Sequence, residues 1–99
     1  MVSTRRRVVV VDRVQTGMRI ERRILKVLKG LAELHDITLG DLIEGIVLHV
    51  FEGKQPFGEE SLSKIAELKR VYQLDLGASA SHRMADRPRG RGRKGGRTR

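Results

Sequence analysis

The sequence predicts a mostly α-helical fold with one N-terminal β-strand, in which two chains form an intertwined homodimer around a two-stranded antiparallel ribbon. Three observations predict it: a segment of alternating polar and apolar residues, two following segments with apolar residues at helical spacing, and a chain of 99 residues whose last quarter holds little apolar material. A domain this small buries little surface, which favours a core shared between two copies. We divide the chain into a basic N-terminal arm (1–12), the strand with two helices (13–53), an additional helix (54–76) and a disordered Arg/Gly-rich basic tail (77–99).

The predicted strand runs from about residue 13 to residue 20 and reads R-V-Q-T-G-M-R-I. Successive side chains of a strand point to opposite faces, so Arg13, Gln15 and Arg19 share one face, and the other face is mostly apolar or β-branched. Gly17 interrupts the polar face, because glycine is depleted in strands and marks a bulge or a close approach of the backbone.

Three helices are expected after the strand. The first covers about residues 21–35, where apolar side chains recur at spacings of three and four. Thr38 is a good N-cap and Asp41 follows three residues later, as in a capping box, so the second helix begins there and Gly53 ends it. A third helix is expected over about residues 59–74, with apolar side chains along one side.

The formal net charge of +9 is distributed unevenly along the chain. Residues 1–23 carry seven arginines against two acidic groups, a balance of +5, whereas residues 24–76 carry six basic and nine acidic groups, a balance of −3. Residues 77–99 carry eight basic groups against one acidic group, a balance of +7. Basic ends around an acidic middle favour a polyanionic partner, nucleic acid, although solvated tails that only confer solubility have the same composition.

A strand followed by two helices has no sheet partner and more apolar surface than it can hide, so each chain is expected to pair with a second one. Two strands paired antiparallel about a twofold axis cover a shared four-helix core with their apolar faces and present the polar faces as a ribbon. Such a ribbon fits the major groove of DNA, where arginine matches guanine and glutamine matches adenine through pairs of hydrogen bonds.

In this arrangement the chain resembles the ribbon-helix-helix family of DNA-binding proteins, the Arc and methionine repressor type, over roughly residues 13–52. The resemblance rests on the alternating strand R-V-Q-T-G-M-R-I, the turn after A-E-L-H-D and the helix that opens with T-L-G-D. It implies that outward strand residues contact bases and that the start of the second helix binds a phosphate. Carried over by position, the base-reading residues are Arg13, Gln15 and Arg19, and the phosphate-binding residues are Thr38, Leu39 and Gly40. Gly17 departs from the family, which usually has a polar side chain at that position.

The sequence therefore predicts a sequence-specific binder of double-stranded DNA, a transcriptional regulator of the repressor type that acts as a homodimer near the nucleoid. Higher-order assembly on DNA and a protein partner at the third helix are further expectations. Non-specific nucleic-acid contacts are expected from basic residues at both ends of the chain: Arg5, Arg6, Arg7, Arg89, Arg91, Arg93, Lys94 and Arg97.

One alternative function is that of an antitoxin that binds its own operator and holds a toxin with the third helix. Another is a non-specific nucleoid or RNA-binding protein led by the tail, against which the scarcity of aromatic residues argues.

The composition also argues against several classes of protein. The chain has no cysteine, and its three histidines lie at no recognised metal spacing, so we expect no metal and no cofactor. No apolar run is long enough to span a membrane or to act as a signal peptide, which favours the cytoplasm. No nucleophile with a base, glycine loop for phosphate or carboxylate constellation stands out, so an enzyme is not expected.

Overall fold

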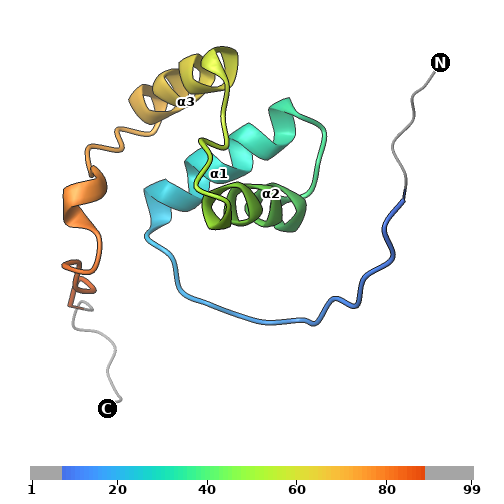
Figure 1. Ribbon diagram of the computed structural model, residues 1–99. Coiled ribbons are helices and arrows are strands. Elements are labelled where there is room, and N and C mark those ends of the chain that lie inside the picture. Colours follow the sequence, from blue (N-terminus) through green and yellow to red (C-terminus); the bar gives the residue numbers. More distant parts are fainter. Residues whose placement is uncertain (1–7, 89–99) are drawn as a thin grey trace.

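The computed structural model describes residues 8–88 and contains three α-helices followed by a short 3-10 helix. The helices are α1 (Arg22–Leu34), α2 (Leu39–Phe51) and α3 (Glu59–Val71), and the 3-10 helix is η1 (Ala78–Ala80). In the described part of the chain, α1 packs on both α2 and α3, whereas α2 and α3 do not pack on each other (Figure 1). The three helices confirm the helical periodicity of the sequence, although α3 ends at Val71 rather than near Leu74.

The predicted β-strand is wrong. Residues 8–20, called here the extended segment, run past α2 without strand structure, and residues 8–88 contain no strand or sheet (Figure 1). The ribbon-helix-helix fold with its intertwined two-stranded ribbon requires a strand at this place, so that fold class is also wrong for this chain. The physical reason is that alternation only tells which side chains share a side of an extended chain. A strand also needs partners for its N–H and C=O groups, and the backbone of the extended segment makes no hydrogen bond to other described residues.

Side-chain caps begin the first two helices. Glu21 precedes α1, and its carboxylate accepts a hydrogen bond of 2.9 Å from the Ile24 N–H. Thr38 precedes α2, and its hydroxyl accepts a hydrogen bond of 3.0 Å from the Asp41 N–H, which confirms the predicted N-cap. Each bond satisfies a first-turn donor that has no acceptor inside the helix, and so each fixes where the helix begins.

All three helices end in the same way, with a residue of positive φ just beyond the C-cap. That conformation lets the next N–H group return to a carbonyl in the last turn, as in a Schellman motif. The positive-φ residues are Asp36 (57°), Gly53 (73°) and Gln73 (56°). The returning bonds run from Ile37 to Ala32 (3.1 Å), from Lys54 to His49 (2.8 Å) and from Leu74 to Lys69 (2.8 Å). Gly53 therefore ends α2 as predicted.

The core lies along α1 where it meets the other two helices. Its buried side chains are Val27, Leu31, Ala32 and Leu42, and partly buried side chains of α2, α3 and the connection before α3 pack on it. A Cβ on Gly30 would lie 2.9 Å from Leu68 Cδ2, so this glycine allows α3 to approach α1 closely. A Cβ on Gly40 or Gly45 would meet no atom within 4 Å, so neither glycine is required by helix packing.

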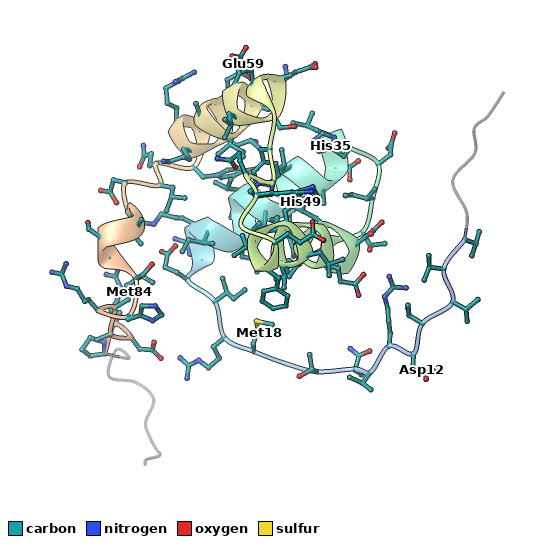
Figure 2. All side chains as sticks on the ribbon, viewed as in Figure 1. Asp12, Met18, His35, His49, Glu59 and Met84 are labelled. Carbon is teal, nitrogen blue, oxygen red and sulfur yellow. The ribbon has the colours of Figure 1, made fainter. Side chains whose placement is uncertain are left out.

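One side of α2 remains open to solvent because the helix packs only on α1. Its exposed apolar side chains are Val47 (37% exposed), Leu48 (63%), Val50 (57%) and Phe51 (80%). Met18 of the extended segment, 67% exposed, is directed toward this helix (Figure 2). We call these five side chains the α2 apolar surface.

Candidate nucleic-acid interface

The two basic parts of the sequence meet at the N-terminal end of α1. An open depression of about 1100 Å³ lies there, between the junction of the extended segment with α1 and the chain before and after η1. It is lined on one side by Arg19, Ile20, Glu21, Arg22 and Arg23, and on the other by Leu76, Met84, Ala85, Asp86 and Arg87. Met84 marks the second side in Figure 2. Residues that lie more than fifty positions apart in the sequence thus form one surface.

The depression has a net positive lining, because four arginines face two carboxylates. Arg19 forms an ion pair with Asp86 across the depression. Arg23 is held by Glu21 at 2.9 Å and by Asp75 at 3.0 Å. Arg22 and Arg87 form no ion pair with other described residues. These two guanidiniums are therefore available to an anion from solution.

Glu21 connects the start of α1 to this charged surface. Its carboxylate accepts from the Ile24 N–H at 2.9 Å and from Arg23 Nε at 2.9 Å. Partial burial acts to raise the pKa of Glu21, but these hydrogen bonds outweigh it and hold the pKa below its usual value. Glu21 therefore stays ionised at neutral pH and fixes Arg23 beside the depression.

Arg13 lies apart from the depression and contacts α2. Its Nε donates to Glu44 Oε2 at 2.8 Å and its Nη2 donates to Glu44 Oε1 at 2.6 Å, so the ion pair is bidentate. The hydrogen bonds from Arg13 hold the pKa of Glu44 below its usual range, against a smaller opposing effect of desolvation. Arg13 remains 65% exposed and Glu44 44% exposed, so solvent and solutes reach the pair.

The predicted base-reading residues are all exposed, but the structure does not gather them into one site. Arg13 contacts α2, Arg19 lines the depression, and Gln15 lies between them without a hydrogen bond to other described residues. Arg13 and Arg19 are six positions apart, which limits their separation along the chain to about 20 Å. They are therefore two points on one exposed segment.

The predicted phosphate-binding residues lie at the start of α2. Thr38 caps the helix, Leu39 is partly buried and Gly40 is exposed. The N–H groups of Leu39 and Gly40 belong to the first turn and have no acceptor within the helix. None of the three residues lines the depression, so this helix end is a separate feature. The remaining predicted contacts lie outside the described residues; they are Arg5, Arg6, Arg7, Arg89, Arg91, Arg93, Lys94 and Arg97.

Sequence reasoning missed the acidic partners of the arginines. Glu44 is 31 residues from Arg13, and Asp86 is 67 residues from Arg19. No local spacing signals such pairs, because the positions of the helices decide them. Glu21 did carry a signal, since it is an acidic residue directly before an amphipathic helix.

None of the protein-family models, curated proteins or solved structures compared with the chain matches it. Across residues 8–88, no helix combines the length and the apolar character needed to cross a membrane. The same residues contain no group of three or more His, Asp or Glu side chains placed to hold a metal ion. The surface described above is thus the feature on which a functional proposal rests.

Proposed function

We propose that the protein binds double-stranded DNA and acts as a transcriptional regulator, with the depression at the start of α1 and the extended segment as its contact surface. One observation carries the proposal: two basic segments from opposite ends of the sequence line the same depression, where Arg22 and Arg87 have no carboxylate partner among the described residues. Phosphate is the anion that such a surface meets repeatedly along a duplex, and each neutralised phosphate releases counterions.

The extended segment supplies the groups for reading bases. An unpaired extended chain is narrow enough to follow the minor groove, as the arms of homeodomains do, and arginine and glutamine read the A·T content and width of that groove. The separation of Arg13 and Arg19, at most about 20 Å, corresponds to at most about six base pairs. Duplex DNA is favoured over single strands because the chain has only one tyrosine and two phenylalanines on which bases could stack.

The salt dependence of binding tests this proposal. Fluorescence anisotropy with a labelled duplex, titrated at several salt concentrations, gives the slope of log K against log salt. Replacing Arg22 and Arg87 with glutamine should flatten the slope by about two units, because each phosphate contact contributes about −0.9. The control is Lys64→Gln with Lys69→Gln on α3, which removes the same charge away from the depression. Equal slopes for the two double variants would contradict the proposed surface, and tighter binding of a single strand than of a duplex would contradict the proposed ligand.

We also propose that two copies pair through the α2 apolar surface. In support, the four helical side chains lie on one side of α2. Glu44 shares that side, but its charge is paired with Arg13 at 2.6 Å, which reduces like-charge repulsion between two copies. If each of the five side chains hides about 60 to 120 Å², the surface contributes roughly 300 to 600 Å² per chain. That range approaches the roughly 800 Å² per partner of a stable interface.

A further inference from the structure

The extended segment is held on α2 and on the chain after η1 by arginine–carboxylate pairs. Arg13 contacts Glu44 of α2, and Arg19 contacts Asp86. The backbone of residues 8–20 makes no hydrogen bond to other described residues, and its side chains make no other hydrogen bond or ion pair with them. The position of this segment therefore depends on two ion pairs and on its covalent connection to α1.

The Arg13–Glu44 pair uses the donors that Arg13 would offer to DNA. Nε and Nη2 point at the two carboxylate oxygens of Glu44 at 2.8 and 2.6 Å. A phosphate or the acceptor edge of a base engages the same two-pronged fork of the guanidinium. Because one fork cannot serve both acceptors with the same geometry, Arg13 must leave Glu44 before it contacts DNA with these donors.

We propose that Glu44 is a positioning residue that holds Arg13 on α2 in the free protein and is displaced by DNA, so that it sets the affinity of the protein for DNA. This inference rests on the proposed function. Glu44 remains ionised at neutral pH, since its pKa lies below the ordinary value. The pair is exposed, so breaking it is inexpensive and DNA can compete for Arg13.

The expected effect of Glu44→Gln is tighter binding. Glutamine keeps the size of the side chain but loses the charge, so Arg13 no longer has to leave a carboxylate. Exposed ion pairs have small coupling energies, which limits the gain in affinity to about two- to five-fold.

Removing any acidic group near a polyanion also improves binding, and that general effect must be separated from the specific one. Asp41 provides the control: it lies three positions before Glu44 on α2 and is close enough to interact electrostatically with Arg13, but it forms no hydrogen bond with it. Asp41→Asn therefore makes the same change in net charge near Arg13 and leaves the bidentate pair intact.

The experiment is a double-mutant cycle over Arg13→Gln and Glu44→Gln, read by duplex binding at fixed salt, with Asp41→Asn in both backgrounds. The expected result is that Glu44→Gln tightens binding when Arg13 is present and has no more effect than Asp41→Asn when Arg13 is replaced. The Arg13 Nε–H resonance should exchange slowly with solvent in the free protein and faster in Glu44→Gln.

Two results would overturn the inference. An equal gain from Glu44→Gln with and without Arg13 would show a general charge effect and would leave the proposed function standing. Absence of duplex binding by the unaltered protein would remove the proposed function and the displacement by DNA together, whatever the exchange rate of the Arg13 Nε–H.

Discussion

Replacing Phe51 with alanine tests the pairing of two chains through the α2 apolar surface. The side chain of Phe51 is 80% exposed, so its removal should change the stability of a single chain by no more than about 0.5 kcal/mol. If a second copy covers it, the loss appears instead in the free energy of association. The substitution therefore separates folding from pairing.

The magnitude follows from the exposed fraction. Full burial of a phenylalanine side chain contributes about 1.5 to 3 kcal/mol, so burying the exposed 80% contributes about 1.2 to 2.4 kcal/mol per chain. In a twofold interface the same side chain contributes from both copies. Phe51→Ala should therefore weaken association by about 2.4 to 4.8 kcal/mol, which raises the Kd by a factor between about 50 and 3000.

Sedimentation equilibrium over a range of micromolar concentrations measures this change. Val71→Ala is the control, because Val71 is 68% exposed on α3 and lies outside the α2 apolar surface. The unaltered protein and Val71→Ala should have about twice the chain mass, whereas Phe51→Ala should dissociate. A single-chain mass for the unaltered protein at every concentration, or equal Kd values for the two variants, would refute the reasoning.

Two further predictions concern the folded chain. Leu31 is 1% exposed, so Leu31→Ala should lower the free energy of unfolding by about 2 to 5 kcal/mol, measured by urea titration. The control Leu62→Ala, at a residue 43% exposed on α3, should lower it much less. Similar losses in the two variants would show that the core is wrongly located. Because the pKa of Glu21 is lowered in the folded chain, its carboxylate stabilises the fold above the unfolded pKa of about 4.5, and this contribution is lost as the pH falls through the lower folded value. The difference in unfolding free energy between the unaltered protein and Glu21→Gln should thus shrink below about pH 4, and a difference independent of pH would contradict the role of the charge.

The helices could be predicted from the sequence because their signals are local. Apolar side chains at spacings of three and four define the sides of α1 and α2 that meet, and Leu31 and Leu42 are buried there. Thr38 and Gly53 mark the ends of α2 through bonds within a few residues of themselves. Such features depend little on the rest of the fold, which is why the sequence alone located them.

The strand was predicted wrongly because alternation is an incomplete signal. Arg13, Gln15 and Arg19 are exposed, as expected for one face of a strand, but Val14 and Met18 of the opposite face are also 84% and 67% exposed. A strand becomes stable only when its backbone pairs with another strand and one face is covered. Neither condition holds for the described residues, so the same alternating sequence remains an extended segment.

The ion pairs could not be predicted because they depend on tertiary placement. Arg13 has carboxylates nearer in sequence, including Asp12 and Glu21, yet its partner is Glu44 on α2. Gly30 shows the same limit, since only the position of Leu68 on α3 explains why a residue without a side chain lies in the middle of α1.

These pairs also change how the charge of the two ends is interpreted. The formal balances of +5 and +7 sum to +12, but the described residues 8–23 and 77–88 carry only +2 and +1, and Glu44 and Asp75 from outside these ranges pair with Arg13 and Arg23. The remaining +9 belongs to residues 1–7 and 89–99. Phosphate contacts raise affinity for all DNA sequences alike, whereas contacts with base edges discriminate between sequences. For a DNA-binding protein this distribution assigns most of the non-specific affinity to the two ends. If the protein binds DNA as proposed, sequence preference falls to Arg13, Gln15 and Arg19, and Arg13 and Arg19 must each leave a carboxylate, Glu44 or Asp86, to contact a base.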